Sequence, residues 1–176
     1  MPAASEPLNE LARYTALMGY HLRKDVLGDP ASDTLVHKAA HRFSVPQAAI
    51  ALVGASMVYF VEHSARAVEL IRANLASLGI KQGFRILQLE ACLALAKLDQ
   101  EEVRASIVFL DPPYKFENTY RTTLEALARS KLAARAQVIA EHEERFDPGS
   151  RFAALERTRK LEQGDTALSF YRPTAA

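Results

Sequence analysis

The chain has 176 residues, of which 49% are hydrophobic and 24% are charged, and its formal net charge at pH 7 is +1. This length and composition suit a globular domain with a sizeable core, and a single cysteine excludes an internal disulfide. The near-zero charge gives no global sign of a polyanion partner. No apolar run approaches the length of a membrane span.

From residue 57 onward, short apolar runs alternate with helical patterns. The runs at 57–62, 84–89, 105–110 and 136–141 predict strands, and the stretches 64–78, 91–98 and 120–131 predict helices. Residues 152–161 and 166–172 predict an antiparallel pair joined by a turn at Gln163-Gly164-Asp165. Strands that alternate with helices indicate an α/β fold with a mostly parallel, doubly wound sheet.

Residues 1–53 do not follow this alternation. Their acidic and basic residues balance, and apolar residues near the start, such as Leu8, Leu11 and Leu22, follow a helical spacing. We therefore predict an atypical, helical N-terminal segment at 1–53 and a separate domain at 54–176.

The tetrapeptide Asp111-Pro112-Pro113-Tyr114 follows the apolar run at 105–110. Each proline fixes φ and removes a backbone N–H, so the loop is stiff and exposes carbonyl groups. Together with a carboxylate and an aromatic ring, such a loop can hold a planar amino group. The structural alternative is a turn in which Asp111 caps the following segment.

The stretch from Ile107 to Tyr114 resembles motif IV, (N/D/S)-P-P-(Y/F/W), of the S-adenosylmethionine-dependent amino-methyltransferases. The segment Val58-Tyr59-Phe60-Val61-Glu62 and the helix after it resemble the second strand of that class. The ending Gly164-Asp165-Thr166-Ala167-Leu168-Ser169-Phe170-Tyr171 resembles the closing strand of the bacterial 16S ribosomal RNA guanine-N2 methyltransferase family, and Glu141-His142 fits its preceding strand end. The resemblance runs from about residue 54 to 172 and implies a Rossmann-like methyltransferase fold with a C-terminal antiparallel hairpin.

The resemblance implies that the tetrapeptide is the catalytic site. Asp111 and the carbonyl of Pro112 would accept hydrogen bonds from the reacting amine, Pro113 would stiffen the loop, and Tyr114 would stack on the base.

It also implies S-adenosylmethionine as the cofactor. Glu62 would accept the ribose hydroxyls, His63 would line the adenosine, and Glu90 would lie beside the adenine. The alternative for each acid is a charge favoured by the dipole at a helix N-terminus.

One motif of the family is missing from the sequence. A glycine-rich turn should follow the first strand, yet residues 41–53 contain no glycine and no acid.

The resemblance as a whole implies a methyltransferase for the exocyclic N2 of a guanine in 16S ribosomal RNA. Two other functions are possible interpretations of the sequence. One is a DNA adenine-N6 methyltransferase, and the other is a non-catalytic methyltransferase-like domain that binds nucleic acid or protein.

The resemblance further implies that the partner is ribosomal RNA or a small-subunit assembly intermediate. It also implies that the protein is cytoplasmic and does not associate with a membrane. We expect a monomer. The five histidines show no paired metal-ligand spacing, so we expect no metal site. His142 is predicted to face the ligand edge or to cap the sheet, and Cys92 to be a small core residue.

Overall fold

The computed structural model describes residues 49–54, 57–77, 79–112 and 117–174. The chain divides into two compact units, one comprising Met1–Val45 with Leu70–Lys81 and the other Pro46–Glu69 with Gln82–Ala176. This division differs from the predicted boundary, since residues 53 and 54 lie within one strand that begins at Ala49. Residues 49–53 are thus extended rather than helical, and the rest of the predicted helical segment lies outside the described residues.

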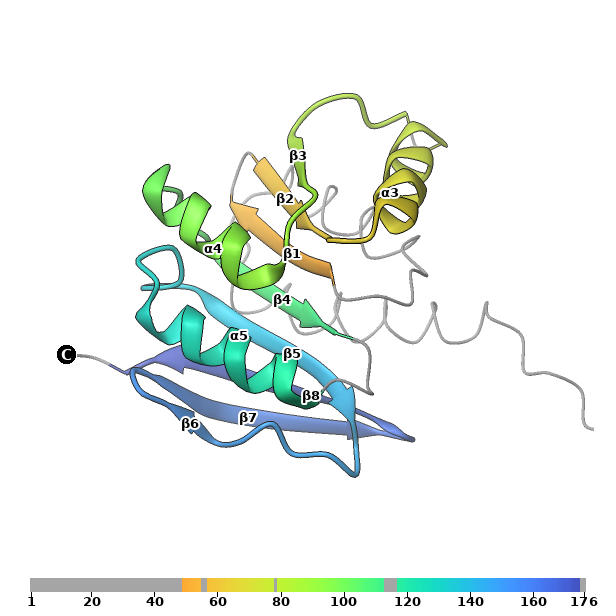
Figure 1. Ribbon diagram of the computed structural model, residues 1–176. Coiled ribbons are helices and arrows are strands. Elements are labelled where there is room, and N and C mark those ends of the chain that lie inside the picture. The colour runs from red at the N-terminus through yellow and green to blue at the C-terminus, as the bar shows by residue number, and fades with distance from the viewer. Residues whose placement is uncertain (1–48, 55–56, 78, 113–116, 175–176) are drawn as a thin grey trace, which may run out of the picture. The chain divides into compact units, whose positions relative to one another are not determined.

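The strands of the second unit are β1 (Ala49–Gly54), β2 (Met57–Val61), β3 (Phe84–Leu87), β4 (Ile107–Asp111), β5 (Gln137–Glu143), β6 (Arg151–Phe152), β7 (Leu155–Gln163) and β8 (Thr166–Pro173). Within the described ranges they form one sheet in the order β3-β2-β1-β4-β5-β8-β7-β6 (Figure 1). β2 pairs with β3 in parallel, and β4 pairs with β5 in parallel. These four strands carry the frame that positions the candidate site.

β1 runs opposite to both of its neighbours, β2 and β4. It is separated from β2 only by residues 55–56, and Gly54 pairs with Met57. So short a connection joins antiparallel strands, because a parallel pair needs a crossover of a dozen or more residues. β2, β3, β4 and β5 consequently share one direction, as predicted, and the reversed β1 between them is a departure from the predicted parallel order.

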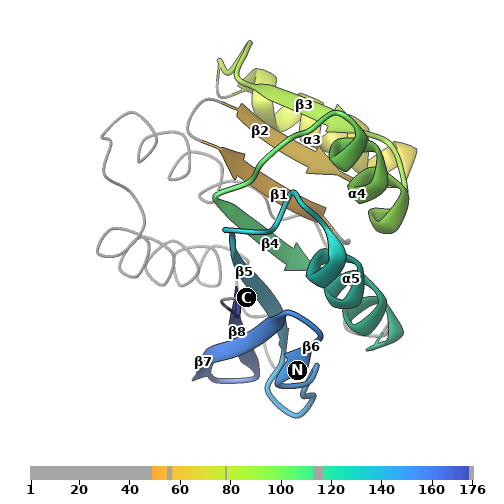
Figure 2. The same cartoon turned by 90° about the vertical axis from the view of Figure 1, so that its left-hand side faces the viewer.

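Two helices, α4 (Ala91–Gln100) and α5 (Glu117–Arg129), lie side by side on one face of the sheet (Figures 1 and 2). Alternate residues of each strand face them. The resulting core joins Ala94, Leu95, Leu98, Tyr120, Leu124 and Leu127 of the helices to Val61, Leu87, Val108, Leu110, Val138 and Ala140 of the strands. Burial of each large aliphatic side chain stabilises the fold by about 1.5–3 kcal/mol.

The predicted core position of Cys92 is wrong, because Cys92 is exposed. Its neighbour Leu93 is also exposed, whereas Ala94, Leu95 and Leu98 are buried. The buried stripe of α4 therefore lies further round the helix than the sequence pattern indicated.

α3 (Ala65–Ser77) begins and ends where its sequence signals predict. The Ser64 hydroxyl accepts a bond from the Ala67 amide at 3.4 Å, which confirms Ser64 as the N-cap. Gly79 has a φ of 69°, and the Ile80 amide donates to the Leu75 carbonyl at 2.9 Å. This is the left-handed helix end that favours glycine.

The predicted C-terminal hairpin is present as β7 and β8, and β8 also pairs antiparallel with β5. Gly164, with a φ of 59°, forms part of its turn. The predicted strand at 152–161 is interrupted, however, because Ala153 adopts a φ of 46° and separates β6 from β7. The hairpin places β8 next to β5, the strand whose end carries part of the candidate site.

Candidate active site

The candidate site lies at one edge of the sheet, where β2, β3, β4 and β5 end. Because these strands share a direction, their carboxyl ends meet at one edge, which is where open α/β sheets bind ligands. Four acids occur there: Glu62 after β2, Glu90 after β3, Asp111 as the last residue of β4, and Glu141 within β5. We call this edge the acidic rim.

Glu62 is almost fully buried, at 1% exposure. Its Oε1 accepts the Ser64 amide at 2.7 Å and lies 3.3 Å from Nδ1 of His63. Its Oε2 is buried and has no hydrogen-bond partner among the described residues. A buried acceptor without a donor is costly, so Oε2 marks a place where a ligand donor would be stabilised.

His63 and Glu90 are both exposed at this edge. Glu90 is the N-cap residue of α4 in extended conformation, yet its side chain makes no capping hydrogen bond. The structure therefore places both predicted cofactor residues on the acidic rim with Glu62, where a ligand could reach them.

Asp111 and Glu141 stand at neighbouring positions on two parallel strands. The register pairs Leu110 with Ala140, so the two acids follow directly after the last paired residues. Asp111 is half-buried and Glu141 is buried. Burial, together with the negative charge of Glu141, holds the pKa of the Asp111 carboxyl well above its usual value. An aspartate with a raised pKa is a stronger proton acceptor than an ordinary one.

The carbonyl of Pro112 is held by a tyrosine. The Tyr120 hydroxyl, from the first turn of α5, lies 3.2 Å from the Pro112 carbonyl oxygen and 2.7 Å from that of Glu141. Asp111 and Pro112 therefore lie at the end of β4 on the acidic rim, and Pro113 and Tyr114 lie outside the described residues. Sequence reasoning missed Tyr120, which reads as one more buried residue of an amphipathic helix.

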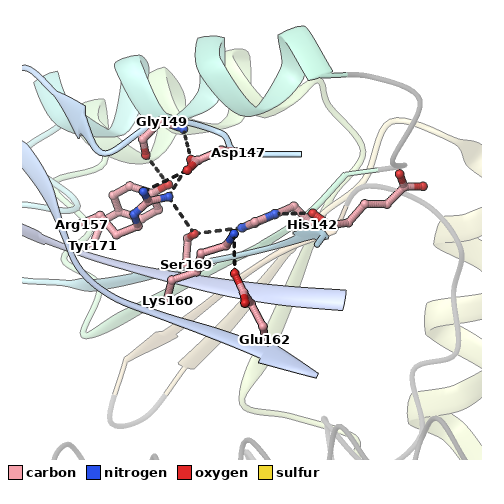
Figure 3. A network of polar contacts seen from close by, with 9 residues as sticks. His142, Asp147, Gly149, Arg157, Lys160, Glu162, Ser169 and Tyr171 are labelled. Carbon is pink, nitrogen blue, oxygen red and sulfur yellow. Dashed lines mark hydrogen bonds and ion pairs between the residues drawn. The ribbon is translucent and has the colours of Figure 1, made fainter. Parts of the chain in front are cut away.

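His142 belongs to a polar network that joins β5 to the C-terminal hairpin (Figure 3). Its ring is fully buried, with Nδ1 2.8 Å from the Glu143 carbonyl oxygen and Nε2 2.9 Å from the Ser169 hydroxyl. Burial lowers the pKa of the ring, so the neutral form is favoured. Since a carbonyl only accepts, Nδ1 carries the hydrogen and Ser169 donates to Nε2. His142 is thus part of the sheet interior rather than a group that faces the rim.

The same network continues to an ion pair on the hairpin. Arg157 bonds both oxygens of Asp147, at 2.6 and 3.0 Å, and also reaches the Ser169 hydroxyl at 3.5 Å. The bidentate bond to Arg157 lowers the pKa of Asp147 to about 2. Tyr171 completes the connection by donating to the Gly149 carbonyl at 2.8 Å. This Asp147–Arg157 brace fixes the segment after β5 to the hairpin and has a structural role.

The described ranges contain no group of three or more histidine, cysteine, aspartate or glutamate side chains arranged to bind one metal ion. In the same ranges, no helix combines the length and the apolar character needed to cross a membrane.

The chain is similar to known proteins. Residues 49–172 match a family model described as Conserved hypothetical protein 95. A Bacillus subtilis (strain 168) protein named "Putative rRNA methyltransferase YlbH" is 25% identical over 114 residues, which are 64% of this chain and 61% of that protein. The alignment thus spans less than two thirds of that relative.

Two of the similar solved structures illustrate the fold. A conserved hypothetical protein from Streptococcus pyogenes is 27% identical, with a TM-score of 0.58 over 68% of this chain and 72% of that one. A structure named "Putative methyltransferase yhhF from Escherichia coli" is 18% identical, with a TM-score of 0.63 over 100% of this chain and 90% of that one. The chain therefore has the Rossmann-like methyltransferase fold that the sequence predicted.

The methyltransferase fold implies S-adenosylmethionine, and the acidic rim fits one end of it. The Oε2 of Glu62, which no described residue bonds, suits a ribose hydroxyl, which is a donor. The glycine-rich turn expected after the first strand has no counterpart at the rim among the described residues. β1 begins at the acidic rim, where Ala49 pairs with Asp111. It ends at Gly54, which pairs with Met57 at the opposite edge of the sheet, so the turn after β1 lies away from the rim. The residues described therefore fit the adenosine end of the cofactor better than its methionine end.

Proposed function

The chain belongs to the family described as Conserved hypothetical protein 95, and on this premise we propose that it is an S-adenosylmethionine-dependent methyltransferase that acts on ribosomal RNA. The observation that carries the proposal is the acidic rim. One edge of a methyltransferase fold holds the buried carboxylate of Glu62, whose Oε2 has no hydrogen-bond partner in the described part of the chain, and the carboxyl of Asp111, whose pKa is raised.

Glu62 binds the cofactor in this proposal. Its Oε1 is already held by the Ser64 amide, which leaves Oε2 as the acceptor for a ribose hydroxyl. Glu90 and His63, which are both exposed, line the adenosine in this proposal. When bound, the cofactor supplies an electrophilic methyl group on a sulfonium sulfur, which leaves as a neutral thioether.

Asp111 and the Pro112 carbonyl orient the amine that accepts the methyl group. An exocyclic amine is a weak nucleophile because its lone pair is delocalised into the base. Two acceptors that bind its hydrogens favour a pyramidal nitrogen, and this orientation lowers the barrier. Asp111 then accepts the proton that the nitrogen loses, which its raised pKa favours.

The substrate that we propose is the exocyclic N2 of a guanine in 16S ribosomal RNA. This RNA would be free or part of a small-subunit assembly intermediate, and the reaction would take place in the cytoplasm. The name of the Bacillus subtilis relative supports an RNA substrate. The target base must leave its stack to reach the rim. Tyr114 would stack on the flipped base, a contact worth about 1–3 kcal/mol.

A second function is favoured by one observation. Because β1 is reversed, the described residues provide no glycine-rich turn for the methionine end of the cofactor. This would suit a non-catalytic methyltransferase-like protein that binds RNA or a protein partner.

The two functions are separated by incubating the purified chain with S-adenosylmethionine labelled in the methyl group. Unmodified 16S ribosomal RNA, the same RNA in small ribosomal subunits, and duplex DNA serve as acceptors, and the digested products are identified by mass spectrometry. We expect N2-methylguanosine from the RNA. Labelled N6-methyladenine in the DNA would support the adenine methyltransferase instead, and RNA binding without any transfer would support the non-catalytic function.

A further inference from the structure

We propose that Tyr120 is a positioning residue for methyl transfer, which holds the Pro112 carbonyl in the direction that the reacting amine requires. The inference rests on the proposed function and assigns a role to a residue outside the Asp-Pro-Pro-Tyr tetrapeptide. Tyr120 itself does not touch the substrate, because its side chain is buried, at 1% exposure.

The two prolines create the need for such a residue. Beyond Leu110, which pairs with Ala140, β4 leaves its partner β5. Pro112 and Pro113 have no N–H, so the backbone of the loop cannot donate a hydrogen bond to β5 at this point. A side-chain donor can then tie the end of β4 to β5.

The Tyr120 hydroxyl provides this donor. It lies 2.7 Å from the Glu141 carbonyl oxygen and 3.2 Å from the Pro112 carbonyl oxygen, so it connects the residue after β4 to β5. A carbonyl oxygen has two lone pairs. The single hydroxyl hydrogen is shared between the two carbonyl oxygens, with the shorter contact to Glu141. The longer bond to the Pro112 oxygen uses one of its lone pairs and orients that carbonyl, and the second lone pair is left for an amine hydrogen.

The tyrosine ring is itself held in place. Its centroid lies 5.2 Å from that of Phe146 and 6.4 Å from that of His142, whose plane is turned by 86°. The ring also belongs to the core that α5 forms with the sheet. Loss of the hydroxyl alone would therefore leave the ring packed and free the Pro112 carbonyl.

Tyr171 offers a matched control. It is the other fully buried tyrosine of the described core, and its hydroxyl also donates to a backbone carbonyl, that of Gly149, at 2.8 Å. This bond belongs to the Asp147–Arg157 brace and not to the acidic rim. Tyr171→Phe and Tyr120→Phe thus remove the same group from equally buried sites and differ in what that group holds.

The experiment measures kcat and KM for methyl transfer to 16S ribosomal RNA, with melting temperature and calorimetric affinity for S-adenosylhomocysteine as further readouts. Tyr120→Phe should lower kcat by tenfold or more, on the order expected for a misplaced reacting group, with unchanged cofactor affinity. Tyr171→Phe should retain the kcat of the parent. Replacing Tyr120 by 4-aminophenylalanine, which can still donate, should restore much of the rate, and this variant decides the matter if Tyr120→Phe does not fold.

A Tyr120→Phe protein with the kcat of the parent would overturn the inference and leave the proposed function intact. If kcat falls in both Tyr120→Phe and Tyr171→Phe, and in proportion to the fall in melting temperature, Tyr120 is a structural residue. A parent chain that binds RNA and transfers no methyl group would overturn the proposed function, and the positioning role with it.

Discussion

Asp111 and Glu141 follow directly after the last paired residues of two neighbouring parallel strands, and the charge of Glu141 adds to burial in raising the pKa of Asp111. Two carboxyl groups at neighbouring positions on adjacent strands are unfavourable for the fold alone. A carboxyl group whose pKa is shifted by burial and by a neighbouring charge, at the expense of stability, is typical of a functional site.

The first prediction concerns stability at the Asp111 position. The folded state raises the pKa of Asp111 above its unfolded value, so it binds the proton more tightly than the unfolded chain does. This stabilisation is complete below the unfolded pKa of about 3.9 and is lost as the pH rises through the folded pKa. Asp111→Asn, which carries no charge, should therefore have a higher free energy of unfolding than the parent at neutral pH.

Urea denaturation across the pH range measures this difference. Asp165→Asn, at the exposed hairpin turn, is the control and should change little. An Asp111→Asn protein less stable than the parent at neutral pH would show that the carboxylate is stabilised, rather than strained, at the rim.

The second prediction concerns Glu62. Glu62→Gln keeps an oxygen for the Ser64 amide but loses the charge of the acceptor that we assign to the ribose. Hydrogen bonds to a charged group contribute about 1.5–3 kcal/mol, so the affinities for S-adenosylmethionine and S-adenosylhomocysteine should both fall by roughly tenfold or more. Calorimetry with both ligands tests this, with exposed Glu156→Gln on β7 as the control. Parent-like binding by Glu62→Gln would remove Glu62 from the cofactor site.

The third prediction concerns the methionine end of the cofactor. Because β1 is reversed, the residues that the structure describes place no glycine-rich turn at the rim, whose backbone amides would contact the charged amino-acid group. Binding of S-adenosylhomocysteine should accordingly be detectable but weak, and adenosine-like fragments should lose little affinity relative to the whole molecule. Titration of the chain with S-adenosylhomocysteine and with methylthioadenosine makes the comparison. Tight binding of the first and none of the second would contradict it.

The fourth prediction concerns the Asp147–Arg157 brace. Because the bond from Arg157 lowers the pKa of Asp147 to about 2, the folded state favours its ionised form. The resulting stability is present above the unfolded pKa and is lost as the pH falls from about 4 toward the folded value. Thermal melts between pH 2 and 7 should show a loss in the parent over this window that is smaller in Asp147→Asn. Parallel curves for the two proteins would contradict the assignment.

Much of the frame was predictable because it depends on local patterns. The strand that ends at Asp111, the helix that ends before Gly79 and the turn at Gly164 were each predicted from apolar runs and turn residues. β1 was missed, because a short apolar run does not distinguish strand from helix by periodicity alone, and its pairing depends on the two-residue connection to β2.

The site was predicted in part for a similar reason. Glu62 and Asp111 close apolar runs and can be found by their position, whereas Tyr120 reaches Glu141 across 21 residues of sequence. Arg157 meets Asp147 only because the hairpin, with its register shift between Arg157 and Arg159, brings them together. Contacts that depend on tertiary register leave no local pattern to read.

The most direct measurement is the initial rate of methyl transfer from S-adenosylmethionine to 16S ribosomal RNA by the parent, Asp111→Asn and Asp147→Asn, at a temperature where all three are folded. The two variants make the same chemical change, one at the acidic rim and one in the brace. We predict N2-methylguanosine from the parent and from Asp147→Asn, and a rate lower by on the order of a hundredfold or more from Asp111→Asn. Equal rates for the parent and Asp111→Asn, or no transfer by the parent, would contradict the account.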